Sequence, residues 1–227
     1  MSITSAINLF RQLSVDESQP SGTTQTRQVN EACFDYLFME MVHTLRSQLQ
    51  AHHPVPDDSG SVSEQASATD RGSRTSASNT HDMPSTREVD EQLLETLYYK
   101  IELIGFRIGQ RLAERYSKDR PRFVDTLDIV KFICRDIWTK LFRKQIDNLK
   151  TNHRGVYTLQ DSQLRWLTRM SGDEGTLQAT QQAIPYLWLP CGIIRGIMAN
   201  HGLDATVTFK DLSLPQCTFH IKLNKPS

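Results

Sequence analysis

The sequence predicts an α+β domain in which helices pack on a small antiparallel sheet. Four segments place apolar residues at the three- and four-residue spacing of a helix. Two pairs of short segments alternate apolar and polar residues as strands do. Along the chain these segments follow one another as three helices, a hairpin, a fourth helix and a second hairpin. This order is typical of an α+β fold.

The first predicted helix covers residues 29–50. Asn30 is suited to cap its N-terminus, and Glu31 falls in the first turn, where negative charge is favourable. The apolar stripe of this helix is longer than a small sheet-backed core needs, so we expect another subunit to complete part of the surface. The apolar face of the second helix belongs to the same expected interface, whose residues are Phe34, Leu37, Phe38, Met41, Val42, Leu45, Leu94, Leu97, Tyr98 and Ile101.

Three further helices are predicted. The second runs from about Val89 to Tyr116, and the third begins near Pro121, because proline is tolerated at the first helical position. The fourth begins at about Pro190 and ends at Gly202, a residue that commonly stops a helix.

Two of these helices carry glycines four residues apart, at Gly105 and Gly109 and at Gly192 and Gly196. Each interior glycine costs roughly 1 kcal/mol relative to alanine, so the four together cost on the order of 4 kcal/mol. Close approach of the helices to each other or to the sheet is the expected gain. A flexible hinge is the alternative.

The strands are predicted at residues 145–151 and 156–160, and at residues 205–210 and 218–223. The connection within the first pair holds Asn152, His153, Arg154 and Gly155. This polar cluster would suit a catalytic loop, but no neighbouring nucleophile or carboxylate has the required spacing. Asn152 and Gly155 both tolerate a positive φ, so we interpret the cluster as the tip of a hairpin that a partner could touch.

Two parts of the chain are predicted to lie outside the folded domain. Residues 51–88 are rich in Ser, Thr, Pro, Gly and charge and contain no Phe, Tyr or Trp, which predicts a disordered insert. Residues 1–28 are interpreted as a largely flexible leader. The predicted organisation is therefore a single domain over residues 29–227, interrupted by the insert.

The amino-acid composition argues against several classes of protein. The 26 basic residues balance the 26 acidic ones, which argues against nucleic-acid binding. The four cysteines are scattered in apolar surroundings, as expected of reduced, buried thiols inside a cell. Neither a membrane-spanning run nor a signal peptide is apparent, so a soluble intracellular protein is expected.

The polar residues of the sequence predict no metal, cofactor or catalytic site. Cys217 and His220 lie three apart on a predicted strand and would point to opposite faces, so no metal site is expected, and neither cofactor nor catalytic residue is predicted.

Between Glu114 and Arg154 basic residues outnumber acidic ones by eleven to six. A solvated helix face explains this surplus, and a docking surface for an acidic protein or an anionic lipid is the alternative.

Six stretches of the chain resemble a known family. They are YLFMEMV, GFRIGQRLAER, LDIVKFICRDIW, KQIDNLKTNHRGVYTLQD, CGIIRGIM and LPQCTFHI. In this order they are similar to the small subunits of the TRAPP vesicle-tethering complex, of the Bet family, and most of all to the subunit-six branch. The resemblance covers about residues 33–50 and 89–223.

This resemblance implies an α/β plait, with four or five helices on one side of a twisted four-stranded antiparallel sheet. It also implies a non-enzymatic scaffold that pairs with a sister small subunit through its first two helices. From the apolar surface of those helices we expect the isolated chain to form a homodimer or to expose a patch prone to aggregate. The assembled complex would act as a guanine-nucleotide exchange factor for a Rab GTPase. The chain is expected in the cytoplasm, at the periphery of Golgi and endoplasmic reticulum membranes. The complex would act in vesicle transport between these compartments.

One position departs from the family. Some sister subunits carry an acylated cysteine just before the third helix, whereas here the stretch YSKDRPRF places Arg120 there. Acylation at this position is therefore not expected. A small-molecule or lipid-binding module of the same fold is the alternative function, and an independent hydrolase finds no triad in the sequence.

Overall fold

The computed structural model describes residues 30, 32–52, 86–152, 155–170 and 176–224. The leader at residues 1–28 and most of the insert at residues 51–88 therefore lie outside the described residues. The ends of that insert are helical, because α2 covers Ala32–His52 and α3 covers Thr86–Ser117. The chain forms two units, residues 1–43 and residues 44–227.

The described part of the first unit is the beginning of α2. The backbone N–H of Ala32 donates to Oδ1 of Asn30 at 2.9 Å, which confirms Asn30 as the N-cap. Further along the helix, the rings of Phe34 and Phe38, four residues apart, stack with centroids 6.3 Å apart.

The second unit is built on a four-stranded antiparallel sheet in the order β1-β2-β4-β3. Strands β1 (Asn148–Asn152) and β2 (Val156–Asp161) form the first hairpin, and β3 (Ala205–Ser213) and β4 (Gln216–Leu223) form the second. Both predicted hairpins are confirmed, with bounds shifted by a few residues. The two hairpins join through the pairing of β2 with β4.

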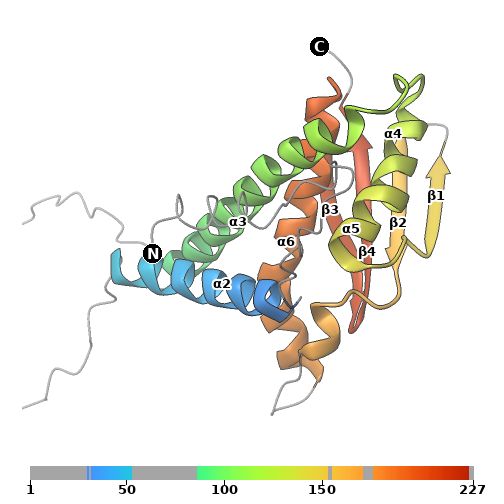
Figure 1. Cartoon of the computed structure of the whole chain (residues 1–227). Coiled ribbons are helices and arrows are strands. Elements are labelled where there is room, and N and C mark those ends of the chain that lie inside the picture. The colour runs from blue at the N-terminus through green and yellow to red at the C-terminus, as the bar shows by residue number, and fades with distance from the viewer. Residues whose placement is uncertain (1–29, 31, 53–85, 153–154, 171–175, 225–227) are drawn as a thin grey trace, which may run out of the picture. The chain divides into compact units, whose positions relative to one another are not determined.

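One face of this sheet is covered by helices. Trp138 packs on Phe219 of β4 with ring centroids 5.6 Å apart, and Trp188 of α6 packs on Phe209 of β3 at 5.5 Å. Phe209 and Phe219 are register partners and therefore share a face of the sheet. Figure 1 shows α4 and α5 over β2 and β4, with α6 beside β3. The structure thus has the predicted α+β architecture, with helices on one side of the sheet.

The third helical segment differs from its prediction. It begins at Thr126, not near Pro121, and it consists of α4 (Thr126–Phe132), a π-helical turn (Ile133–Ile137) and α5 (Trp138–Phe142). Phe123 precedes the helix, and its ring lies 5.2 Å from that of Phe132 and 4.9 Å from that of His201. These aromatic contacts join Phe123 to α4 and to the end of α6, and Asp125, between Phe123 and the helix, has an extended backbone.

The fourth helix was predicted too short. Helix α6 runs over Thr176–Asn200 and contains both Pro185 and Pro190, so a start at Pro190 was wrong. A proline inside a helix removes one backbone hydrogen bond, but burial along the helix compensates for that loss. Its buried side chains include Ala183, Leu187 and Leu189 around the two prolines. The C-terminal prediction is confirmed, since Gly202 has a φ of 77°.

Candidate interaction surfaces

The four glycines lie where α3 and α6 cross. A Cβ atom on Gly192 would lie 2.9 Å from the carbonyl carbon of Glu102, and one on Gly196 would lie 2.8 Å from that of Phe106. A Cβ on Gly105 or Gly109 would meet the backbone of α6 in the same way. The helix backbones are therefore in direct contact, at a distance that only glycine permits.

Polar and aromatic groups flank this crossing. Nε of Arg195 lies 2.9 Å from Oε1 of Glu102, and the guanidinium sits 4.9 Å from the ring centroid of Phe106. Tyr98 of α3 stacks on Trp188 of α6 with centroids 5.6 Å apart. Burial raises the pKa of the Tyr98 phenol, and the nearby charge of Arg46 partly offsets that rise. These contacts hold α3 against α6 from Tyr98 onward. Some of the residues of α3 that precede Tyr98 line a separate groove.

A groove of about 320 Å³ lies between the end of α2 and the start of α3. Leu49, Leu93, Leu94 and Leu97 form its apolar wall, while Arg46, Gln50 and Asp90 supply the polar groups. Protein interfaces usually have an apolar centre and a polar rim, and the groove combines residues of both kinds.

The structure divides the predicted partner-interface residues into two sets. Leu45, Leu97 and Ile101 are 3%, 1% and 0% exposed, so these three side chains have no free surface for a partner. Leu94 and Tyr98 are partly exposed. On the beginning of α2, Phe38 and Val42 are buried, whereas Phe34, Leu37 and Met41 are partly exposed. Two exposed aromatic residues were missed, Tyr36 at 69% and Tyr99 at 60% exposure.

The hairpin tip is described only in part, because His153 and Arg154 lie outside the described residues. Oδ1 of Asn152 accepts a hydrogen bond of 2.9 Å from the backbone N–H of Val156, and Gly155 has a φ of 76°. A side chain that bonds the backbone across a glycine turn closes the connection locally. Asn152 and Gly155 therefore have turn-forming geometry.

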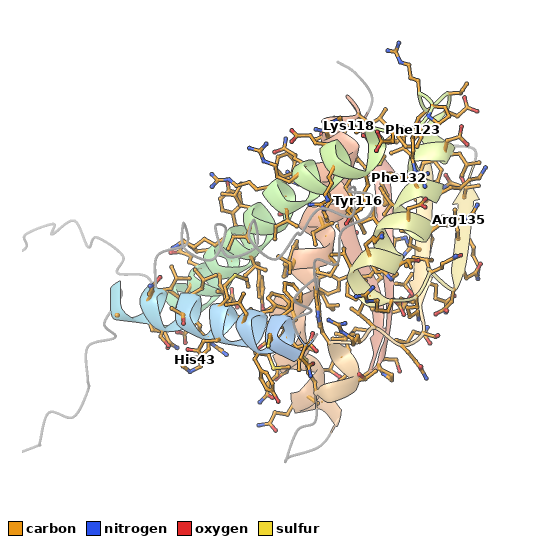
Figure 2. All side chains as sticks on the ribbon, viewed as in Figure 1. His43, Tyr116, Lys118, Phe123, Phe132 and Arg135 are labelled. Atoms are coloured by element: carbon orange, nitrogen blue, oxygen red, sulfur yellow. The ribbon has the colours of Figure 1, made fainter. Side chains whose placement is uncertain are left out.

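The position of Arg120 holds an ion pair. Its guanidinium lies 2.5 Å from Oδ1 of Asp136 and 5.0 Å from the ring centroid of Phe132. Figure 2 labels Phe123, which precedes α4, and Phe132, the last residue of α4, whose rings lie 5.2 Å apart. Arg120 therefore caps an aromatic cluster, and no nucleophile for acyl transfer stands at this position.

Three of the four cysteines are buried, and their thiols are poor nucleophiles. Burial raises the pKa of Cys134 and of Cys217 to about 12, and raises that of Cys191 well above its usual range. These three thiols stay protonated near neutral pH and are unreactive. Cys33 is exposed, so the expectation that all four thiols are buried was wrong for this residue.

A buried carboxylate ties α5 to the sheet. Asp161 is fully buried; its Oδ2 accepts a 2.8 Å hydrogen bond from Nε1 of Trp138, and its Oδ1 lies 2.6 Å from Nζ of Lys144. Lys144 also pairs with Asp147 at 3.0 Å. For Asp147 burial opposes ionisation, but hydrogen bonds from Ser162 and Lys144 outweigh it and lower the pKa to about 2. The network is saturated by internal partners and holds the first hairpin in place.

The described residues form neither a metal-ion cluster nor a membrane-spanning helix. No three His, Cys, Asp or Glu side chains in that part of the chain gather as a group that could hold a metal ion. Every helix that the structure describes is too short or too polar to cross a membrane.

Comparison with known proteins assigns the chain to a family. Residues 34–224 match the family described as transport protein particle (TRAPP) component. Trafficking protein particle complex subunit 6B of Homo sapiens is 50% identical over 126 residues, which are 56% of this chain and 78% of that protein. An uncharacterized protein of Schizosaccharomyces pombe is 34% identical over 196 residues, covering 86% of this chain and 64% of that protein.

A solved structure has the same fold. It is trafficking protein particle complex subunit 3 from Naegleria fowleri, covalently bound to palmitic acid, with a TM-score of 0.55 and 12% identity. The alignment covers 86% of this chain and 98% of that one. The chain therefore belongs to the TRAPP component family, and within it is similar to subunit six.

Proposed function

We propose that this chain is a non-enzymatic scaffold subunit of the TRAPP tethering complex. The observation that carries the proposal is the family match, which spans residues 34–224 and so covers nearly all of the second unit and the end of the first. The described surfaces support it, since the groove and the half-exposed side chains suit contact between proteins. Guanine-nucleotide exchange on a Rab GTPase, in transport between the endoplasmic reticulum and the Golgi, would be a property of the assembled complex.

The proposed partner is a sister small subunit, bound through the first two helices. On α3 the contact surface is the groove wall that includes Leu93 and Leu94, with Arg46 and Asp90 as charged neighbours. On the beginning of α2 the corresponding residues are Phe34, Leu37 and Met41, which are partly exposed. Aromatic residues, Met and Arg are the types enriched in such interfaces. A homodimer through the same helices is the proposed state of the isolated chain.

The experiment is purification of the tagged chain from its own cells, followed by identification of the proteins that accompany it. Other TRAPP components are expected in stoichiometric amount. Nucleotide exchange on Rab GTPases of those cells is expected from the purified assembly and not from the chain alone. Exchange by the chain alone, or purification without any TRAPP component, would contradict the proposal.

A lipid-binding module is the second candidate. It is favoured by the palmitic acid that the subunit 3 structure of Naegleria fowleri carries. Against it, Arg120 and its pairing with Asp136 occupy the position where family resemblance places an acylated cysteine. Mass spectrometry of an organic extract of the purified chain separates the two candidates, because a scaffold yields no stoichiometric lipid.

A further inference from the structure

The face of the sheet that the helices do not cover is polar. Strand residues that pair across an antiparallel sheet share a face, so the register assigns twelve residues to this side in three rows of four. The rows are Asn152, Val156, Lys222 and Thr206; Lys150, Thr158, His220 and Thr208; and Asn148, Gln160, Thr218 and Lys210. Three lysines and one histidine stand among four threonines and three amide side chains, Val156 is the one apolar residue, and these twelve positions hold no carboxylate.

A hollow of about 340 Å³ opens on this face. Its lining residues come from all four strands, and they are Asn148, Lys150, Thr158, Gln160, Asp211, Gln216, Thr218 and His220. Neighbouring strands are about 4.8 Å apart, so a hollow that reaches from β1 to β3 spans roughly 14 Å. This volume lies within the usual range for small-molecule sites.

One polar atom in the lining lacks a partner. Nδ1 of His220 lies 3.3 Å from Oγ1 of Thr158. The other ring nitrogen, Nε2, is buried and has no hydrogen-bond partner among the described residues. Buried polar groups are nearly always hydrogen-bonded, so this unpaired nitrogen is an exception, and it belongs to a residue that lines the hollow. Lys150 is exposed and stands in the same row of the sheet, with Thr158 between it and His220.

A carboxylate lies at the β3 end of the hollow. Asp211 follows Lys210, at the place where the register of β3 and β4 shifts, and its φ is 50°. Backbone in this region is unfavourable for most residues, and Asp is among the few that tolerate it. A carboxylate repels phosphate but accepts hydrogen bonds from hydroxyl groups. The amides of Asn148, Gln160 and Gln216 can also bond hydroxyls.

We propose that this hollow binds a phosphorylated polyol. Lys150, His220 and Thr158 hold the phosphate group through charge-assisted and neutral hydrogen bonds. Asp211 and the amide side chains bind the hydroxyl groups of the ring. The same chemistry belongs to a free inositol phosphate and to the headgroup of a phosphoinositide lipid. The site is independent of the helices proposed for pairing, so its failure and the failure of the proposed function are separable.

The test measures binding of inositol trisphosphate to the full-length chain by titration calorimetry. Lys150→Gln and His220→Gln are expected to weaken binding by about tenfold or more, because each loses a contact to phosphate. Lys131→Gln removes a lysine that is half-exposed on α4, and it is the matched control with unchanged binding. No binding by the unaltered chain, or equal weakening by Lys131→Gln, would overturn the proposal.

Asp211→Asn tests the other end of the ligand. This substitution keeps a residue that tolerates a positive φ and removes the negative charge. It is expected to weaken inositol trisphosphate but not inorganic pyrophosphate, which has no hydroxyl ring for Asp211 to bind. Equal weakening of both probes, or no effect on inositol trisphosphate, would refute the role of Asp211 in binding a polyol.

The source of the ligand is decided with phosphatidylcholine vesicles that contain phosphatidylinositol bisphosphate. If the headgroup is the natural ligand, the chain sediments with these vesicles, Lys150→Gln does not, and soluble inositol trisphosphate competes. If the ligand is soluble, calorimetry gives binding while sedimentation gives none. Both results support the site, and absence of binding in both assays overturns it.

Discussion

Four glycines determine how closely α3 and α6 approach each other. A Cβ on Gly196 would lie 2.8 Å from the carbonyl carbon of Phe106, a backbone atom that cannot rotate away. Gly196→Ala is therefore expected to destabilise the fold by about 2 kcal/mol or more, although alanine is the better helix former. Gln182→Ala, at an exposed position of the same helix, is the control. Chemical denaturation gives both values, and equal stability of the two variants would contradict the close crossing.

Asp147 predicts an acid-sensitive contribution to stability. Its folded-state pKa of about 2 lies below the ordinary value, so the charged form is stabilised in the folded chain. This stability is complete above the unfolded pKa of about 4 and is lost as the pH falls towards 2. Because Asp147 is 42% exposed, solvent screening limits the contribution to about 1 kcal/mol.

Asp147→Asn is expected to remove that contribution and to flatten the stability profile between pH 4 and pH 2. Asp125→Asn, at an exposed residue before α4, serves as the control. Urea denaturation at a series of pH values measures the effect. A profile of Asp147→Asn that is as steep as that of the unaltered chain would show that the network of Lys144 and Ser162 does not stabilise the charge.

The role of a single residue was predictable where it depends only on the local backbone. Asn30 and Gly202 mark helix ends because a side-chain oxygen and a positive φ satisfy the terminal backbone groups, and both signals are local. Cys33 was not predictable in this way, since exposure depends on what packs against a helix face. The pairing of Asp161 with Lys144 and Trp138 is likewise formed by residues distant in sequence.

At the scale of elements, α6 was missed over its first half. Prolines at 185 and 190 predict an interruption, and the helix is apolar on most sides, so the contrast between two faces is weak. Burial of Leu187 and Leu189 outweighs the lost hydrogen bonds. The strands were predicted well, because one covered face gives a strict alternation that survives along β2.

The segment between α2 and α3 gives a prediction at the same scale. Replacement of residues 54–85 by a short Gly/Ser linker is expected to change the melting temperature by no more than a few degrees. The reason is composition, since a stretch without aromatic residues cannot bury enough area to offset its ordering. Differential scanning calorimetry of the two proteins checks it. A larger fall would mean that the segment contributes to the folded core.

At the scale of the whole molecule, the fold followed from the order of elements, but the interface did not. Periodicity assigned Leu94, Leu97 and Ile101 to one apolar face and could not tell core from contact surface. The structure buries Leu97 and Ile101 and leaves Leu94 partly exposed in the groove. The polar outer face of the sheet was likewise not predictable, because its rows combine residues from four strands and are defined only by the strand register.

Pairing through the first two helices is the central claim, and Leu94 tests it most directly. The measurement is the amount of TRAPP components that accompany the tagged chain from its own cells, for the unaltered chain, Leu94→Glu and Thr96→Glu. Thr96 is an exposed residue of the same helix that does not line the groove, so its variant carries the same new charge. Circular dichroism and the melting temperature verify that each variant is folded. Loss of the partners in Leu94→Glu, with full recovery in Thr96→Glu, is expected because an uncompensated charge would enter a desolvated contact. Full recovery of the partners with folded Leu94→Glu would contradict the claim.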